Sequence, residues 1–468
     1  MSKQSEGSKS SRFDLSSEEI TSEPLYRVLM YIATPLLVQN LVWVIQQIVD
    51  LFWIGQFSSI AVSAIGLVLP ATSLLLVTVI SIPFIGTQIL VSQELGSGNK
   101  SAARRISSSG VIISVLFAVC LGALAYAASQ PLLEILLSYR QEPESNIILL
   151  AKAYLQILAI GVVFAAVSDV LEATFISWGR SRYSLYINIV NIVVNLSLDP
   201  ILIFGIGPIP VLGVRGAAIA SVGGYVSGLI IAVSLALFYD KNEYLSFDIT
   251  HSAEYIKLLK VGVPAGVRDT IVPIADLIFI GIVFTVGGAA GSAAYIVGSR
   301  VASVANLLAE SLETATRSIV GQNAGANYPH RANRMVWVST SIITIVLSSC
   351  GIMQWLSANF IVSTLSPELE GSALDLAATC LRIYALGYPG LGLIAVIQAG
   401  FDAGGRTTVG FVASLLKYWV IQIPIALVSG LILDYSVVTL FWAIALSNTT
   451  VAIILVWYYY TTQKKLFK

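Results

Sequence analysis

The sequence predicts an all-α polytopic membrane protein in which twelve transmembrane helices form two pseudo-symmetric six-helix bundles. Its 468 residues are 56% hydrophobic and only 11% charged, and that charged fraction is about half of what is usual in a soluble protein. The apolar runs are long and continuous rather than alternating, which favours helices over a β-barrel. Several motifs occur twice at a nearly constant spacing, as expected for two halves of similar structure.

Twelve apolar spans follow one another along the chain. Several exceed the ~20 residues that a bilayer requires, so we expect tilted, kinked or protruding helices. The expected spans are residues 27–55, 59–89, 106–128, 145–178, 183–206, 213–239, 253–286, 289–318, 335–363, 371–402, 408–433 and 437–462.

The basic residues predict which side of the membrane each connection faces. Of the 26 Lys and Arg residues, 19 lie in the two tails and the even-numbered connections, against two, Arg140 and Arg215, on the opposite side. Positively charged connections stay in the cytoplasm. We therefore expect a multi-pass protein of the plasma or inner membrane with both termini in the cytoplasm. Its expected parts are a flexible tail (1–25), a six-helix lobe (26–239), a cytoplasmic linker (240–252), a second lobe (253–463) and a short tail (464–468).

The composition argues against several classes of function. The net charge is zero, which argues against a nucleic-acid partner. Cys120, Cys350 and Cys380 lie singly in apolar runs, and no His, Cys, Asp or Glu cluster with metal-ligand spacing occurs. No nucleophile–base arrangement and no Walker loop occur either, so we expect neither an enzyme nor an ATP-driven pump, and no cofactor.

Two pairs of motifs define an internal repeat. SQELGSGNKSAARR from residue 92 and GQNAGANYPHRANR from residue 321 differ by 229 residues, which pairs Gln93 with Gln322; the same offset pairs Pro35 with Pro264. FISWGRSRYS from residue 175 matches FDAGGRTTVG from residue 401 at an offset of 226. Because six spans precede each boundary, the halves are parallel repeats, and two facing bundles leave a central cleft of the kind that transporters use.

The stretch NIVNIVVNLSLDP in the fifth span places a polar stripe on an apolar helix. At about 100° per residue, Asn188, Asn195 and Asp199 fall within roughly 20° of one line, with Asn191 about 60° away. A carboxylate in hydrocarbon must face a cavity, an ion or a partner. The amides alone could equally join helices by hydrogen bonds.

The first span carries a second polar stripe, which ends in Asp50. Gln39, Trp43, Gln46 and Gln47 lie within about 60° of the Asp50 direction. Counted from the expected outer ends of the two spans, Asp50 and Asp199 lie at similar depths, roughly 9–12 Å below the outer surface. Two acids at one depth in one bundle can share a proton, since like charges in low dielectric resist being ionised together. Alternatively, the carboxylates and asparagine carbonyls could bind Na⁺.

The repeat indicates that this polar site is not needed for folding. The offsets carry Asp50 to Phe279, and Asn195 and Asp199 to Ile421 and Ile425. The second bundle therefore folds without the stripe. We predict a cation or proton site in the first bundle that comprises Asp50, Asn188, Asn191, Asn195 and Asp199, with no metal beyond Na⁺ at Asp50, Asn195 and Asp199.

The chain resembles the multidrug and toxic compound extrusion (MATE) transporters. The resemblance covers nearly everything after residue 25 and rests on PLLVQNLVWVIQQIVDLFWIGQ (35–56), the SQELGSGN and GQNAGAN motifs, taken as loops, the GR pair at 179–180 and LDPILIFG…LGVRGAAIAS (198–221). Asp50, Asn195 and Asp199 resemble the DinF-like branch. The resemblance implies two lobes in a V shape, alternating access and efflux of organic, often cationic and amphiphilic compounds against inward H⁺ or Na⁺. Lipid-linked and polysaccharide flippases share this architecture, so a flippase is the alternative function.

Other residues are candidates for the cleft or for coupling. Asp169 and Glu172 either line the cleft or pair with Arg180. The pairs Arg268–Asp269 and Glu313–Arg317 are expected to be structural, the second near Glu310, whereas Lys417 has no evident partner and is expected to extend toward the cytoplasm. Pro35 is a candidate hinge because it removes a helix hydrogen bond. Further candidates are Gln46, Gln47, Trp43, Asp276 and Tyr295.

The sequence thus predicts a monomeric secondary antiporter whose partners are a small organic substrate and the lipid bilayer. H⁺ or Na⁺ is the expected coupling ion.

Overall fold

The computed structural model describes residues 15–137, 145–239, 243–246, 248, 252–367, 369–433 and 435–467. The first fourteen residues of the expected N-terminal tail, much of the expected linker and Lys468 lie outside the described residues, as do the basic residues Arg140 and Lys241, which helped to predict orientation.

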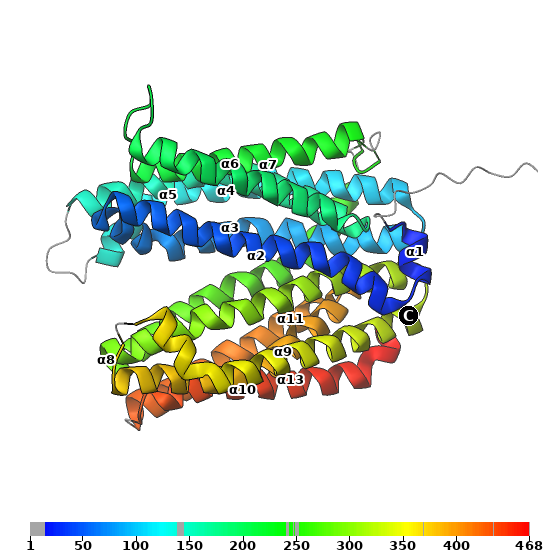
Figure 1. Cartoon of the computed structure of the whole chain (residues 1–468). Coiled ribbons are helices and arrows are strands. Elements are labelled where there is room, and N and C mark those ends of the chain that lie inside the picture. The colour runs from blue at the N-terminus through cyan, green and yellow to red at the C-terminus, as the bar shows by residue number, and fades with distance from the viewer. Residues whose placement is uncertain are drawn as a thin grey trace, which may run out of the picture.

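Six membrane-length helices form the N-terminal lobe, drawn in blue to green in Figure 1. Their lengths of 21 to 38 residues follow from uninterrupted apolar runs, and the longest extend beyond what a bilayer requires. The helices are α2 (Leu25–Phe57), α3 (Ser59–Gly96), α4 (Lys100–Leu137), α5 (Ser145–Ser177), α6 (Ser181–Phe204) and α7 (Val214–Ser234), which continues into the π-helical η1 (Leu235–Tyr239).

The C-terminal lobe contains the other six spans. Its elements are α8 (Ser252–Gly325), α9 (Pro329–Leu365), α10 (Ser372–Ala403), the continuous span formed by α11 (Thr407–Ser414), η2 (Leu415–Gln422), α12 (Ile423–Ala426) and η3 (Leu427–Ile432), and α13 (Val438–Leu466).

The 74-residue α8 comprises two spans rather than one. Gly288 interrupts it with φ 57° and ψ −149°, a conformation outside the helical region that glycine adopts because it has no Cβ. Eleven helices in the described part of the chain are long and apolar enough to cross a membrane, and the break in α8 makes twelve spans. The twelve-helix prediction is confirmed.

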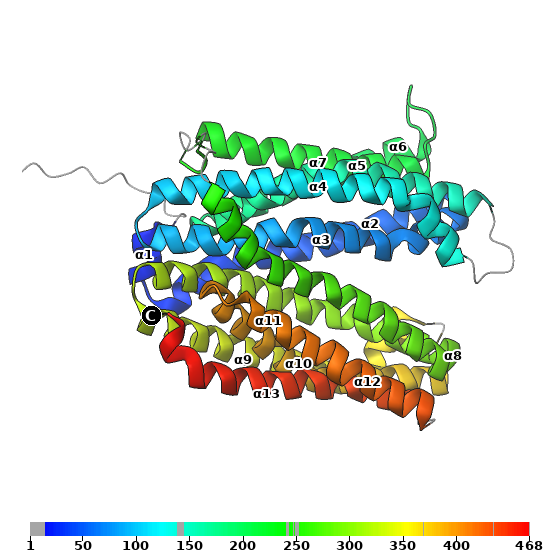
Figure 2. The same cartoon turned by 180° about the vertical axis from the view of Figure 1, so that it is seen from behind.

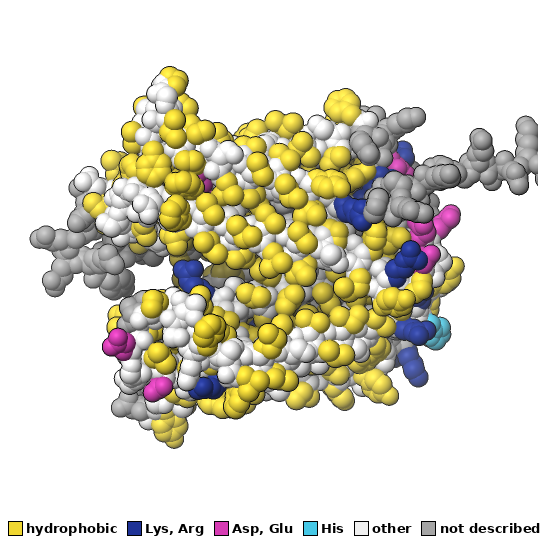
Figure 3. All heavy atoms as spheres, viewed as in Figure 1, with side chains coloured by type: hydrophobic (Ala, Val, Ile, Leu, Met, Phe, Trp, Pro, Cys, Tyr) yellow, Lys and Arg dark blue, Asp and Glu magenta, His cyan; other side chains and the backbone are white. Residues whose placement is uncertain are grey.

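The two lobes lie against each other in a V. Both described ends of the chain lie at one end of the bundle, called here the terminal end, where the lobes meet (Figure 1). Viewed from behind, α3 and α8 run alongside each other at the boundary of the lobes (Figure 2). The space-filling view shows a hollow between the lobes at the opposite end, whereas most Lys and Arg side chains on this face lie at the terminal end (Figure 3).

The repeated motifs form the closest contact between the lobes. A Cβ added to Gly96 would overlap the backbone of Gln322, and a Cβ added to Gly325 would overlap the backbone of Gln93. The contact is thus made twice, once from each half of the repeat. The motifs were expected as loops, but residues 92–96 and 321–325 are the helical ends of α3 and α8. Their glycines do not form turns; they allow the backbones of the two helices to approach each other closely.

The short helix α1 (Ser17–Ser22) differs from the expected flexible tail. A capping box formed by Ser16 and Glu19 begins it, and Ile20 is fully buried beside Gly179 at the end of α5. Arg331 of α9 donates to the carbonyl oxygens of Ile20, at 3.2 Å, and of Glu23. Helix α1 therefore contacts both lobes at the terminal end.

We expect Gly96→Ala to destabilise the protein, because the added methyl group meets backbone atoms that cannot rotate away. Overpacking of this kind costs about 1–3 kcal/mol. Gly66→Ala in the same helix is the control, since a Cβ there meets nothing within 4 Å. Thermal unfolding in detergent should show a lower midpoint for the first variant only, and equal midpoints would contradict the close contact.

Candidate functional site

Asp50 of α2 and Asp199 of α6 form an acid pair in the N-terminal lobe. Asp199 is 1% exposed and Asp50 is half-buried, and their carboxyl groups lie within hydrogen-bonding range of each other. Two ionised carboxylates repel at such a separation, so this contact requires a proton or a cation between the oxygens. Oδ2 of Asp199 is buried and has no hydrogen-bond partner among the described residues. No amide or hydroxyl group therefore satisfies this oxygen, which leaves it to the proton or cation that joins the two acids.

Amide groups of the two polar stripes surround the acid pair. The Asn195 side chain is fully buried and accepts a hydrogen bond from Nε2 of Gln46 at 2.7 Å. With its amide turned over, its nitrogen donates to Oδ1 of Asp50 at 3.1 Å and its oxygen accepts from the Ser221 backbone N–H at 3.2 Å. In this second orientation both atoms of the Asn195 amide have partners, and the side chain joins Asp50 to the α7 backbone.

A second buried carboxyl group, Glu172 of α5, lies nearer the terminal end. It is 3% exposed. Three side chains contact it: Ser184 Oγ at 2.5 Å, Asn188 Nδ2 at 2.9 and 2.8 Å, and Gln39 Nε2 at 3.4 Å. Ser184 Oγ also lies 2.7 Å from Oε1 of Gln39. Helices α2, α5 and α6 are thereby joined around one acid.

The structure divides the expected polar stripe between different partners. Asn188 binds Glu172, about 16 Å along the helix from Asp199 at 1.5 Å per residue. Asn191 faces α7, where a Cβ on Gly224 would overlap its side-chain oxygen. Of the three asparagines, only Asn195 joins the acid pair. Helical periodicity placed all four residues near one line, but it could not show that neighbouring helices supply a different partner at each turn.

The remaining candidates occupy varied places. Asp169 is half-buried and close enough to Glu172 for electrostatic interaction, whereas Arg180, its other expected partner, pairs with Glu243 at 3.6 Å. Trp43 is 52% exposed and Gln47 is exposed, so neither packs inside the lobe.

In the C-terminal lobe, Tyr295 is 8% exposed and its ring lies 5.6 Å from that of Phe279 inside the hydrophobic core. Asp276 is exposed and within electrostatic range of Lys417. Lys417 was expected to extend toward the cytoplasm, but it is 7% exposed and donates to the hydroxyl of Tyr418 at 3.0 Å. A nearby aromatic hydroxyl thus replaces water as its partner.

Pro35 lies where α2 passes from one lobe to the other. The segment before it, including Val28 and Ile32, is buried in the hydrophobic core of the C-terminal lobe. The segment after it carries Gln46 and Asp50 along α6 of the N-terminal lobe. A proline removes a backbone hydrogen bond from the helix interior, so α2 can bend at this crossing.

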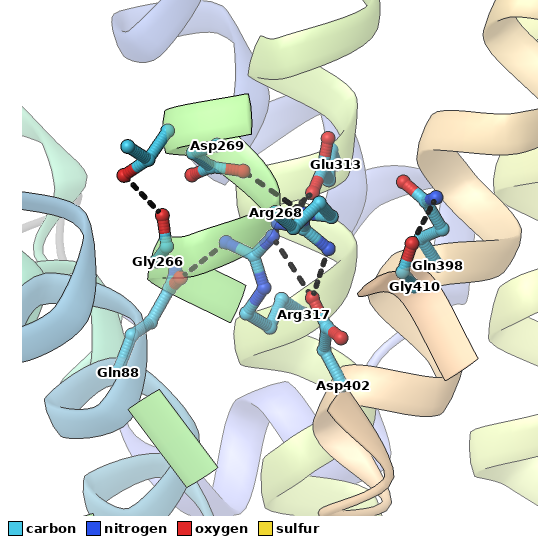
Figure 4. A network of polar contacts seen from close by, with 10 residues as sticks. Gln88, Gly266, Arg268, Asp269, Glu313, Arg317, Gln398, Asp402 and Gly410 are labelled. Carbon is cyan, nitrogen blue, oxygen red and sulfur yellow. Dashed lines mark hydrogen bonds and ion pairs between the residues drawn. The ribbon is translucent and has the colours of Figure 1, made fainter. Parts of the chain in front are cut away.

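A polar network at the boundary of the lobes contains the expected ion pairs (Figure 4). Arg268 donates from Nε to Oδ1 of Asp269 at 2.9 Å, and Arg317 forms an ion pair with Glu313. Both predicted pairs are confirmed. Glu310, one turn before Glu313 on α8, is exposed.

Sequence reasoning missed two members of this network, Asp402 and Gln88. Asp402 is fully buried and lies 3.1 Å from Nη1 of Arg268 and 3.4 Å from Nη2 of Arg317. Gln88 of α3 accepts from Nη1 of Arg317 at 2.9 Å. The available signal was the repeat, because an offset of 226 pairs Asp402 with the apolar Ile176 and an offset of 229 pairs Arg317 with Gln88.

In the described part of the chain, no group of three or more His, Cys, Asp or Glu side chains could hold a metal ion.

Comparisons with known proteins match both halves of the chain. The MatE family model matches residues 35–201 and 264–428, one match in each half of the chain. The FAD transporter of Shewanella oneidensis is 25% identical over 91% of this chain and 94% of its own length. The probable multidrug resistance protein YoeA of Bacillus subtilis is 27% identical over 86% of this chain and 87% of its own.

Solved structures share the fold. An outward-facing multidrug resistance MATE family transporter of the MOP superfamily aligns with a TM-score of 0.87 and 18% identity, over 97% of this chain and 99% of that one.

Double-mutant cycles should separate the two acid sites. We expect Asn188→Ala and Glu172→Gln to couple by about 0.5–3 kcal/mol, because they share hydrogen bonds, whereas Asn188→Ala and Asp199→Asn should be nearly additive. Unfolding in mixed detergent–SDS micelles gives the free energies of unfolding. Strong coupling of Asn188 to Asp199 instead would restore the single continuous site.

Proposed function

The chain belongs to the MatE family, and from this premise we propose that it is a secondary antiporter that exports organic compounds in exchange for inward-moving protons. As a member of that family it is a multi-pass membrane protein that transports compounds, rather than an enzyme.

The observation that carries the proposal is the acid pair. Asp50 and Asp199 lie within hydrogen-bonding range, and Asp199 retains a buried oxygen with no partner among the described residues. No Lys or Arg of the described chain lies within ion-pair distance of either acid. A buried acid pair without a basic partner must be neutralised by a proton or a cation. The direct approach of the two carboxyl groups favours a shared proton over Na⁺, which would have to hold the oxygens around itself.

The arrangement of the lobes supports alternating access. The hollow lies at the end opposite the termini. At the terminal end the two lobes are in contact, and we call this contact between the lobes the seam (Figures 1 and 3). If the termini are cytoplasmic, as the distribution of basic residues predicts, this is an outward-facing state. Because α2 packs in both lobes on either side of Pro35, a change of charge at Asp50 can alter the bend of the helix and so the angle between the lobes.

The substrate class rests on the relatives. The similar proteins carry names that refer to multidrug resistance or to FAD, and we propose small organic molecules as cargo and the plasma or inner membrane as the location. The acids in α2 and α6 support a place in the DinF-like branch. We propose that the protein acts as a monomer, since each chain carries both lobes.

Substitution of either acid should abolish coupling. We expect Asp50→Asn and Asp199→Asn each to lower the rate of export driven by an imposed pH gradient at least tenfold, because neither amide can exchange a proton. Proteoliposomes with independently imposed H⁺ and Na⁺ gradients measure this, with a multidrug substrate panel and FAD as cargo.

Glu134→Gln on the exposed surface of α4 is the matched acid-to-amide control; it keeps an acceptor oxygen for Gln130 and should transport normally. Export driven by Na⁺ alone would replace the proton by Na⁺ in this proposal. Full pH-driven export by both acid variants would reject the coupling site altogether.

Pro35→Ala tests the hinge. The substitution restores a helix hydrogen bond, so α2 should stiffen and pH-driven export should fall several-fold while the protein remains folded. Pro264→Ala, at the repeat-related position of α8, is the matched control, because that helix has no counterpart of the acid pair. Unchanged export and unchanged pH dependence for Pro35→Ala would exclude the hinge.

A further inference from the structure

The seam that closes the terminal end is held by hydrogen bonds between uncharged groups. Each connects an N-terminal-lobe helix with α8 or α10, and most use an amide or hydroxyl side chain with a backbone carbonyl. The contacts are Asn40 with Ser311 (3.1 Å), Thr78 with Thr270 (3.2 Å), Gln88 with the Thr314 carbonyl (3.0 Å), Gln93 with the Ala403 carbonyl (2.7 Å), Gln322 with the Ser177 carbonyl (2.6 Å) and Ser318 with the Ile176 carbonyl (3.0 Å).

Two of these bonds are one contact made twice. Gln93 and Gln322 occupy equivalent positions of the repeat, at an offset of 229, and their acceptors Ser177 and Ala403 are equivalent at an offset of 226. Each lobe therefore presents the same donor and the same acceptor to the other. Such a contact forms and breaks symmetrically about the axis that relates the lobes.

The charged groups at the seam are paired inside the C-terminal lobe. Arg268 and Arg317 bind Asp269, Glu313 and Asp402, all of which lie on α8 or α10. Figure 4 shows the two guanidinium groups between these acids.

One bond of the network leaves the C-terminal lobe, and its partner is neutral. Nη1 of Arg317 donates to Oε1 of Gln88, which is fully buried on α3. One ion pair does join the lobes: Nε of Arg105 on α4 lies 2.8 Å from Oε1 of Glu254 in the first turn of α8, and both side chains are partly exposed. Within the buried seam of the described chain, no ion pair spans the lobes.

This distribution determines how costly it is to part the lobes. A neutral hydrogen bond contributes little net free energy, because its groups bind water once they are exposed. A buried ion pair is much harder to separate, since each charge loses its partner. Both arginines keep their carboxylate partners when the seam opens, and only the neutral Gln88 is lost.

We propose that the seam is a reversible gate whose opening depends on the neutrality of Gln88. The gate rests on the proposed alternating access only for its role in transport; the contacts that form it do not depend on that proposal. A carboxylate at this position would form an ion pair with Arg317 across the lobes and hold the terminal end closed. Gln88 is thus a positioning residue for the conformational change.

Labelling of a buried cysteine measures the gate directly. Ser92 is fully buried at the seam, and a Cβ added to Gly321 would lie 2.8 Å from the Cβ of Ser92. Ser92→Cys, in a chain whose Cys120, Cys350 and Cys380 are replaced by Ala, should react with a water-soluble maleimide in detergent only while the lobes are apart. The assay uses no substrate and no ion gradient, so its result does not depend on whether the antiport proposal holds.

We expect Gln88→Glu to slow this labelling at least tenfold, because the new ion pair with Arg317 outweighs the lost hydrogen bond from the Gln88 amide to the Thr314 carbonyl. Gln88→Met has similar volume but no charge and no amide, and it should label as fast as the parent or faster. Equal slowing by both variants, or no slowing by Gln88→Glu in a folded protein, overturns the proposal.

The repeat supplies a second test that does not depend on folding of the glutamate variant. Gln93→Ala and Gln322→Ala remove equivalent bonds, so each should accelerate labelling by a similar factor, about two- to tenfold. Labelling rates that both match the parent would show that these bonds do not hold the gate, which also overturns the proposal.

Discussion

A carboxyl group inside a membrane needs a proton, a cation or a basic partner, and the two lobes satisfy this need differently. In the C-terminal lobe Arg268 and Arg317 form ion pairs with three acids. In the N-terminal lobe Asp50 and Asp199 have each other and amides, without a basic side chain within ion-pair distance in the described chain. The acids of the C-terminal network therefore have basic partners, whereas the acid pair of the N-terminal lobe depends on a bound proton or cation for neutralisation.

This division follows from a duplication whose halves have diverged at most positions. The backbone contacts of Gly96 and Gly325 and the bonds of Gln93 and Gln322 retain the original symmetry. The symmetry is lost where Asp199 corresponds to Ile425 and where Asp402 corresponds to Ile176. The symmetric residues hold the lobes together, and the asymmetric ones give each lobe its chemistry. The MatE family match to each half separately agrees with this reading.

The sequence was sufficient for the fold because hydrophobic length determines membrane spans and the repeat determines their grouping. It also brought Asp50 and Asp199 together, since depth can be counted from span ends. It could not assign Asn188 to Glu172 or Asn191 to α7, because the partners of a helix face depend on rotation against neighbouring helices. Asp402 and Gln88 were missed for the same reason: each lies in an apolar or small-residue run, and only the packing of α3, α8 and α10 brings them to Arg317.

The path of α2 across the lobes bears on how the molecule is assembled. Leu25, Leu29 and Leu36 are interior residues of a core whose other members come mostly from the second half of the chain. That core is incomplete until the start of α2, which is made early, docks against the helices of the C-terminal lobe, which are made later. The two halves of the duplication are consequently not independent folding units. A C-terminal half produced alone would expose an apolar groove to lipid or to aggregation. During insertion of the whole chain, α2 must remain undocked until the C-terminal helices have been made.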